Sequence, residues 1–422
     1  MSHPSPEPLS GAPADPDQPA DRSPAGGVRW WMLGLLAVAE MLAMGLWMTA
    51  SAVSAPLSEL WQLSPTQAGL LMTSVQIGFV AGTAVLALSN LADLVSGRWL
   101  FAVSAVAAAL SNAGLLLSAG YPAALVFRVL TGLFLAGVYP PAMKMVATWF
   151  DDFRGLAIGT VVGALAIGKA TPWLLKLAGD NRWEAVVGGS SLAALLAALL
   201  VALGYRDGPC AFPKRPFSWS LVGQVLRDRP TRLATCGYLG HMWELYAMWT
   251  WVPAYLAAAA VAAGSSALPL VDLAAFASIA VGGAGCVAGG LLADRIGRPK
   301  TVNLAMLVSG FCCLASGLVF GMPLWIVISV TLVWGFFVVA DSAQFSAMVT
   351  EVAPRHAVGT ALSIQTSLGF LLTTSTIQLV PLIQSTVGWR WAFAILVLGP
   401  AAGIMAIERF ARLGQPDATD VR

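Results

Sequence analysis

Charged residues are scarce in this sequence. They make up only 10% of its 422 residues, whereas 58% are hydrophobic, and the mean hydropathy is +0.76. Soluble domains carry roughly 25% charged residues, and a globule of this size must expose much of its surface to solvent. The composition therefore excludes an ordinary soluble protein and indicates that a lipid bilayer is the solvent. The net charge of +2 is not gathered on one basic face, which argues against a nucleic-acid partner.

Residues suited to metal, redox or nucleotide chemistry are also few. The five cysteines show neither metal-ligand nor disulfide-framework spacing. Of the three histidines, only His241 lies in a long apolar run, so the ligand clusters of a membrane enzyme are missing. The chain contains no G-x-x-x-x-G-K-[ST] loop, which argues against a primary ATP-driven pump. We expect no enzyme activity, cofactor or resident metal.

Long apolar runs are abundant, and each is close to the roughly 20 residues that a helix needs to cross the hydrocarbon core. Their number predicts twelve transmembrane helices. The runs lie near 30–53, 67–88, 99–119, 122–146, 155–177, 184–204, 232–257, 272–293, 301–320, 324–348, 359–382 and 389–409.

Two polar segments flank and divide these runs. Residues 1–27 are rich in proline and predict a disordered tail. The stretch 206–231 mixes prolines and basic residues with apolar side chains, which suggests an interfacial helix on the inner leaflet. We therefore expect a tail at 1–27, a six-helix bundle at 28–205, a cytoplasmic linker at 206–231, a second six-helix bundle at 232–410 and a tail at 411–422.

The basic residues predict the orientation. If the N-terminus is inside, cytoplasmic segments hold 17 of the 23 Lys and Arg residues, external loops hold three, and three lie within spans. Under the positive-inside rule, this bias places both termini and the linker in the cytoplasm. The expected location is the inner (cytoplasmic) membrane.

The two halves of the chain repeat each other. The pattern E-x-x-A-M-x-x-W begins at Glu40 in the first span and again at Glu244 in the seventh. A Gly-Arg pair follows an aspartate after the second and eighth spans, and Gly132 in the fourth span matches Gly335 in the tenth. Repeated halves with a substrate site between them, near the midplane, are typical of secondary transporters.

The segment 290–300, G-L-L-A-D-R-I-G-R-P-K, resembles the signature loop of the major facilitator superfamily (MFS). A degraded copy lies at 90–98, where Asn90 replaces the leading glycine and one residue is inserted before Gly97. The resemblance implies an all-α membrane fold of two pseudo-symmetric six-helix bundles. It also implies that an acid and arginines in these loops tie helices together in one state. The alternative is that these are only positive-inside residues in a tight turn. The implied gating residues are Asp93, Arg98, Asp294, Arg295 and Arg298.

Two further family patterns bear on function. Arg128-x-x-x-Gly132 resembles the second motif of the family, whose arginine faces the central cavity. The alternative is that Arg128 snorkels to the outer surface. The glycine-proline pattern of drug antiporters is only loosely met in the fifth span, which weakens a drug-efflux interpretation.

Ionisable residues inside spans are costly, by roughly 2.5–3.5 kcal/mol each on an insertion scale, and are retained mainly for function or pairing. Glu40 and Glu244 fall near the middle of spans that line the cavity in this family, and the alternative is that they only hold helices together. Lys169 could either neutralise a glutamate or hold an anion. The full set of candidate substrate- or proton-binding residues is Glu40, Trp47, Arg128, Tyr139, Lys169, His241, Glu244, Met248, Trp251, Asp341 and Gln344.

These observations favour a proton-coupled secondary transporter of a small organic anion, such as a carboxylate, that works by alternating access. Glu40, Glu244 and Asp341 are candidate proton carriers, because desolvation favours a protonated carboxyl. Arg128, Lys169 and His241 would supply positive charge. We favour Glu244 as the coupling site, because His241 lies one turn away on the same face.

Several alternatives stay open. The tryptophans in the spans would suit proton-driven efflux of an amphipathic compound. Met41, Met44 and Met48, with His241 and Met248, could form a soft-metal path for copper, although methionine at helical spacing is more often packing. A transport-dead membrane sensor would need an output domain that is not evident. The expected partners are a small-molecule substrate, protons and the lipid bilayer, and we expect a monomer.

Overall fold

The computed structural model describes residues 26–89, 91–150, 153–179, 182–209, 219–265, 268–354 and 357–413. Within these ranges the secondary structure is helical, without strands. Twelve segments are long and apolar enough to cross a membrane, so the predicted fold class is confirmed. The boundaries agree closely with the apolar runs: the fourth span, expected at 122–146, extends over Tyr121–Ala147.

The N-terminal half contains six spans, of which the fourth is broken into two helices. Its spans are α1 (Gly26–Ala52), α3 (Pro65–Ser89), α5 (Gly97–Ala113), α6 (Tyr121–Leu135) with α7 (Tyr139–Ala147), α8 (Arg154–Ala178) and α9 (Trp183–Gly204). Short helices α2 (Ser54–Trp61) and α4 (Leu91–Leu94) lie between spans.

The C-terminal half repeats the six spans, with breaks in the eighth, tenth and twelfth. Its spans are α11 (Arg229–Ala262), α12 (Leu268–Ala280) with α13 (Gly282–Ile296), α14 (Arg298–Val319), α15 (Leu324–Ala340) with α16 (Ser342–Val352), α17 (Val358–Val387), and α18 (Trp389–Ala392) with α19 (Leu398–Leu413). Within the predicted linker, α10 (Trp219–Arg227) packs on α11 and α17.

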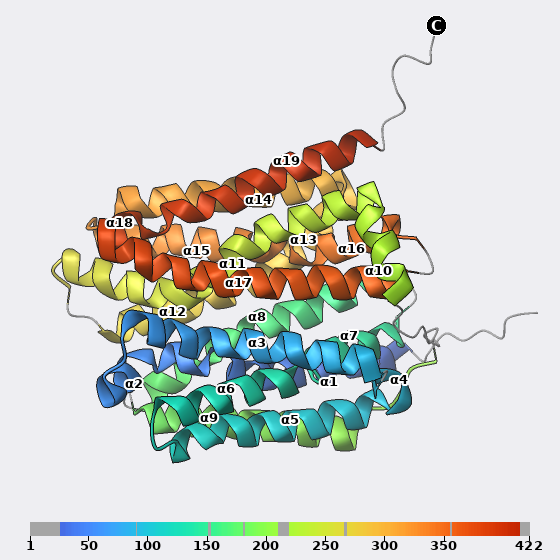
Figure 1. Cartoon of the computed structure of the whole chain (residues 1–422), viewed down its shortest axis with the longest axis horizontal. Helices are drawn as coiled ribbons and strands as arrows, with labels where there is room; N and C mark the ends of the chain where they lie inside the picture. The colour runs from blue at the N-terminus through green and yellow to red at the C-terminus, as the bar shows by residue number, and fades with distance from the viewer. Residues whose placement is uncertain are drawn as a thin grey trace, which may run out of the picture.

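The two halves form two layers of roughly parallel helices (Figure 1). Two pairs of spans join the layers: α3 packs against α17, and α8 packs against both α12 and α13. Helices α4 and α10 lie at one end of the bundle (Figure 1). We call it the basic end because the segments 97–98 and 295–300, which carry arginines, belong to it. Helices α2 and α18 lie at the other, which we call the opposite end (Figure 1).

Proline explains one of the helix breaks. Pro140 and Pro141 lack the N–H groups that would continue the helical ladder to the carbonyls of residues 136 and 137, so α6 ends before α7 begins. The tenth span breaks at Asp341, between α15 and α16. The two breaks occupy related places in the repeat and leave backbone groups near mid-span available to side chains.

Paired glycines allow neighbouring spans to cross closely. A methyl group on Gly132 of α6 would collide with the Val75 carbonyl of α3, and one on Gly335 of α15 would collide with the Ser278 carbonyl of α12. Close backbone approach at small residues is a common way for membrane helices to pack. The glycines that match in the two repeats therefore serve the same packing contact in each half.

Candidate functional site

Lys169 lies where the two halves meet. It projects from the middle of α8, is almost fully buried, and donates a hydrogen bond to the Tyr246 hydroxyl of α11, in the other half. Its ammonium also sits over aromatic faces, 4.1 Å from the ring centroid of Trp47, 4.5 Å from that of Tyr246 and 5.3 Å from that of Trp249. Cation–π contacts of this kind are strongest where the cation is desolvated.

Five aromatic side chains form a cluster around this lysine, which we call the aromatic centre. Trp47 of α1 lies 4.9 Å from Phe79 of α3 and 5.3 Å from Phe370 of α17, centroid to centroid. Tyr246 of α11 lies 5.3 Å from both Phe370 and Trp249. All five are buried, and the contacts run across the boundary between the halves.

Glu40 is fully buried in α1, and neither of its carboxyl oxygens has a hydrogen-bond partner in the described part of the chain. Lys169 is close enough for its charge to act on this carboxyl. Tyr139, the first residue of α7 and half-buried beside the break in the fourth span, also lies within reach of the field of Glu40. A buried carboxyl without donors is an unusual and costly arrangement.

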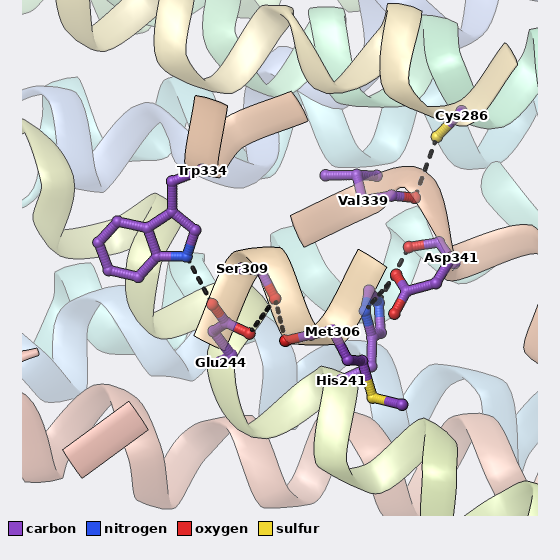
Figure 2. Close-up of polar contacts among 9 residues, drawn as sticks. His241, Glu244, Cys286, Met306, Ser309, Trp334, Val339 and Asp341 are labelled. Atoms are coloured by element: carbon purple, nitrogen blue, oxygen red, sulfur yellow. Dashed lines mark hydrogen bonds and ion pairs between the residues drawn. The ribbon is translucent and has the colours of Figure 1, made fainter. Parts of the chain in front are cut away.

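Glu244 is equally buried but fully hydrogen-bonded. Its carboxylate accepts from Trp334 Nε1 at 2.5 Å, Ser309 Oγ at 2.9 Å and Cys313 Sγ at 3.2 Å. Figure 2 shows Trp334 and Ser309 pointing at the carboxylate from α15 and α14. Glu244 thus links three spans of the C-terminal half.

His241 contacts the break in the tenth span instead of Glu244. Its Nδ1 lies 2.9 Å from Asp341 Oδ1 (Figure 2), and its Nε2 lies 2.9 Å from Ser342 Oγ. Asp341 and Ser342 are the residues at which α15 gives way to α16. The imidazole therefore joins α11 to this break, and its engagement removes the reason for preferring Glu244 as the coupling site.

Trp251, one of the candidate binding residues on α11, lies on a face of this helix that is turned into the C-terminal half. On this face Trp251 donates to the Ile377 carbonyl of α17 at 2.8 Å, Tyr255 donates to the Ser316 carbonyl of α14 at 2.6 Å, and Met248 is fully buried. The face that meets the other half carries Tyr246 and Trp249. Helical spacing shows which residues share a face but not the direction of that face.

Arg128 is buried within the N-terminal half and does not snorkel. It donates to the backbone carbonyls of Leu46 at 2.9 Å and Trp47 at 2.6 Å, both on α1, and to Asn112 Oδ1 at 3.2 Å. These bonds hold the turn of α1 that presents the Trp47 ring to the aromatic centre.

The gating residues form different contacts in the two halves. Arg298 donates to Glu351 Oε1 at 2.8 Å and to Gln344 Oε1 at 2.7 Å, so it ties α14 to α16 and engages Gln344 away from the aromatic centre. Arg98 donates to the Ala202 carbonyl of α9. Asp294 and Arg295 are exposed. The side chain of Asp93 lies outside the described residues.

Polar contacts also cross between the halves towards the opposite end. Lys176 of α8 forms an ion pair of 2.8 Å with Asp272 of α12, and Gln378 Nε2 of α17 donates to Thr73 Oγ1 of α3 at 3.4 Å. The carboxylate of the ion pair is buried, whereas the lysine is about one-quarter exposed. Each of the two junctions between the halves thus carries a polar contact on that side of the aromatic centre.

Several residues at the site escaped the sequence analysis. Phe79, Tyr246, Trp249 and Phe370 complete the aromatic centre, and buried Gln365 of α17 has both amide atoms without a partner in the described ranges. Aromatic residues at positions 246 and 249, three apart on a span, were the available signal. Across the described residues, no three His, Cys, Asp or Glu side chains gather to form a metal site.

A twelve-span helical protein with two repeated halves and a buried charged centre between them belongs to the class of membrane transporters. The Major Facilitator Superfamily model matches residues 35–375, and the chain belongs to that family. It is therefore a multi-pass membrane protein of a transporter family, and the resemblance inferred from its signature loop is confirmed.

Individual relatives are distant. The MFS transporter asaE of Aspergillus flavus is 27% identical over 232 residues, a match that covers 53% of this chain and only 50% of the relative. A bacterial homologue of the human lysosomal transporter Spinster, solved inward-facing and unoccupied, aligns with a TM-score of 0.74 at 15% identity, over 94% of this chain and 100% of that one. Its inward-facing, occupied form aligns with a TM-score of 0.68 at 15% identity, over 91% and 97%. At this identity the likeness concerns the fold alone.

Proposed function

We propose that this protein is a proton-coupled secondary transporter that carries a small organic anion together with a proton by alternating access. The observation that supports this most directly is the presence of two oppositely charged groups, Glu40 and Lys169, at the boundary between the halves. Glu40 is a buried carboxyl that receives no hydrogen bond within the described ranges, and Lys169 is a buried ammonium held by aromatic rings. Among the residues that the structure describes, neither has the hydrogen-bonded ion-pair partner that a purely structural buried charge requires.

Charge balance in a dry site supplies the coupling. With the site empty, ionised Glu40 offsets the charge of Lys169. When an anion binds to Lys169, the centre would carry one excess negative charge unless Glu40 takes up a proton. A net buried charge is costly, so the anion and the proton bind together and leave together. Each state that crosses the membrane is then close to neutral.

Glu40 is the proton carrier in this scheme, in place of Glu244. Three donors satisfy Glu244, including the N–H of Trp334. Hydrogen bonds to a carboxylate favour its ionised form and fix its geometry. Glu40 has no such donors in the described part of the chain, so its protonation state is free to follow the charge at Lys169.

The helix breaks and the contacts towards the opposite end support the alternating movement. The breaks beside Tyr139 and at Asp341 allow the inner parts of the fourth and tenth spans to move separately from the rest. The Lys176–Asp272 pair, with Gln378–Thr73, would have to separate when the site opens to the opposite side. Arg298 ties α14 to α16 and would therefore restrain α16, the part of the tenth span on the basic-end side of its break.

The orientation in the membrane follows from the same positive-inside argument as above. We propose that the basic end faces the cytoplasm, that both termini lie there, and that the protein resides in the cytoplasmic membrane as a monomer. The interior of each half is packed by its own helices, and the charged centre lies between the two halves of one chain, so one chain suffices for the site.

Proton movement during anion uptake tests this proposal. Purified protein would be reconstituted into lightly buffered liposomes, and the external pH recorded after addition of pyruvate, lactate, benzoate or phenylpyruvate. We expect at least one of these anions to alkalinise the medium beyond the signal of protein-free liposomes, and Lys169→Met to abolish that excess. Saturable anion uptake without any excess pH change would contradict proton coupling, and absence of uptake for every anion would contradict the substrate class.

A further inference from the structure

The aromatic centre is built from both halves of the protein. Trp47 and Phe79 come from α1 and α3, whereas Tyr246, Trp249 and Phe370 come from α11 and α17. Trp47 and Phe79 meet Phe370 at centroid distances of 5.3 and 4.7 Å, and Trp47 meets Tyr246 at 5.7 Å. Aromatic rings from the two halves therefore contact each other in tilted pairs at the place where a substrate would have to separate them.

A positive charge already occupies this cluster. The Lys169 ammonium lies over the rings of Trp47, Tyr246 and Trp249. An aromatic cage without a lysine would suit a quaternary ammonium compound. Here a cationic ligand would meet a like charge in a water-poor site, whereas an anion would neutralise that charge. The lysine in this cage therefore disfavours a cationic ligand, and the charge of an anion that it binds is balanced when Glu40 takes up a proton.

Two buried hydrogen-bond donors at the same place are unused. The indole Nε1 atoms of Trp47 and Trp249 have no acceptor in the described ranges, and both side chains are at most 2% exposed. An indole N–H can only donate, so the missing partner is an acceptor. The Lys169 ammonium lies over both indole rings, so the two donors belong to rings that meet at this one lysine. A carboxylate offers two oxygens with several acceptor positions and matches this set.

We propose that the anion carried by this protein is an aromatic carboxylate. Its carboxylate would bind the Lys169 ammonium and the indole N–H groups of Trp47 and Trp249. Its flat ring would stack between aromatic residues of the two halves and replace the direct contact of Trp47 with Phe370 and Tyr246. This inference rests on the proposed anion transport and names the class of anion.

Calorimetric binding to the purified protein compares benzoate with cyclohexanecarboxylate. The two anions have the same charge and carbon skeleton, but only benzoate has a planar π-face. Stacking on two faces should give benzoate an affinity about tenfold higher. Phe370→Leu should reduce this ratio to threefold or less by weakening benzoate alone. Trp249→Phe keeps the ring but removes the donor, so it should weaken both anions by a similar factor.

Trp251→Phe provides the matched control. Trp251 is on the same helix, but its indole donates to the Ile377 carbonyl and it lies outside the aromatic centre. This substitution should leave the ratio of the two affinities at the wild-type value. If Trp251→Phe removes the preference and Phe370→Leu does not, the ring binds elsewhere and the proposed site is wrong.

The remaining outcomes separate this inference from the proposed function. Equal binding of benzoate and cyclohexanecarboxylate, or binding of acetate and pyruvate alone, would overturn the aromatic class while leaving anion transport intact. Binding of benzyltrimethylammonium with no binding of any carboxylate would overturn both. Preferential binding of benzoate that is lost in Lys169→Met is the result expected here.

Discussion

Glu40 and Glu244 occupy the same position in the two repeats, but only Glu244 is hydrogen-bonded. Three donors from α14 and α15 reach the Glu244 carboxylate, whereas both oxygens of Glu40 lack a partner throughout the described part of the chain. A sequence repeat has thus been retained while the two carboxyls have acquired different surroundings. This difference is the basis of the proposal that Glu244 has a structural role and Glu40 a titrating one.

Removal of the strongest donor to Glu244 should destabilise the protein without uncoupling it. Trp334→Phe leaves a buried carboxylate oxygen poorly paired, at a cost of about 1–3 kcal/mol. We expect a clear fall in the melting temperature, while anion uptake still depends on the proton gradient. Trp325→Phe, on the same helix but exposed, should change neither. Lost coupling in Trp334→Phe at an unchanged melting temperature would argue that Glu244 carries the proton.

Arg128 should act by positioning Trp47. Its guanidinium donates hydrogen bonds to two adjacent carbonyls of α1 and to one side chain of α5. A lysine ammonium reproduces this geometry poorly. Arg128→Lys should therefore lower the melting temperature and weaken anion binding roughly five- to tenfold, a loss near 1 kcal/mol or slightly more. Arg412→Lys, at the exposed end of α19, is the control. If Arg128→Lys abolished binding with unchanged stability, Arg128 would itself bind the substrate.

The Lys176–Asp272 pair should bias the protein towards the state closed at the opposite end. A partly exposed ion pair contributes up to about 1 kcal/mol, so its loss shifts a two-state equilibrium by roughly fivefold at most. Asp272→Asn should enlarge the population of molecules in which the two halves are far apart at the opposite end. The measurement is the distribution of electron–electron distances between spin labels at exposed Leu60 and Val387. The double exchange Lys176→Asp with Asp272→Lys should restore the original distribution. An unchanged distribution in Asp272→Asn would show that the pair does not hold this end closed.

Replacement of Lys169 separates its charge from its packing. Lys169→Met keeps an unbranched chain in the aromatic centre but removes its positive charge, so anion binding should fall by about a hundredfold or more, as expected for a charge-assisted interaction in a buried site. Lys144→Met, on α7 towards the basic end, serves as the comparison and should retain binding within a few-fold. Binding that survives Lys169→Met would remove the lysine from the substrate site.

Span number and span length could be predicted because each depends on local composition. The signature loop at 290–300 and the repeat that begins at Glu40 and Glu244 then identified the family. The orientation of α11 could not be predicted in the same way. Spans of a bundle are buried on more than one side, so apolar residues surround the helix and the sequence does not distinguish the side facing the other half.

Contacts at the site depend on segments far apart in the chain. Lys169 was recognised as an intramembrane charge, but its contact with Tyr246 joins residues 77 positions apart. The donors that distinguish Glu244 from Glu40 lie 65 to 90 positions away from it. Such pairings depend on how helices are rotated and on their depth in the bilayer, which periodicity and composition do not determine.

The central claim is that Glu40 carries the coupled proton and Glu244 does not. The most direct test reconstitutes wild type, Glu40→Gln and Glu244→Gln into liposomes and measures two activities: accumulation of the anion driven by an imposed pH gradient, and exchange of labelled for unlabelled anion without a gradient. Glutamine imitates a permanently protonated carboxyl. We predict that Glu40→Gln keeps exchange but loses gradient-driven accumulation, and that Glu244→Gln retains both at reduced protein stability. Accumulation by Glu40→Gln at the wild-type level would contradict the account.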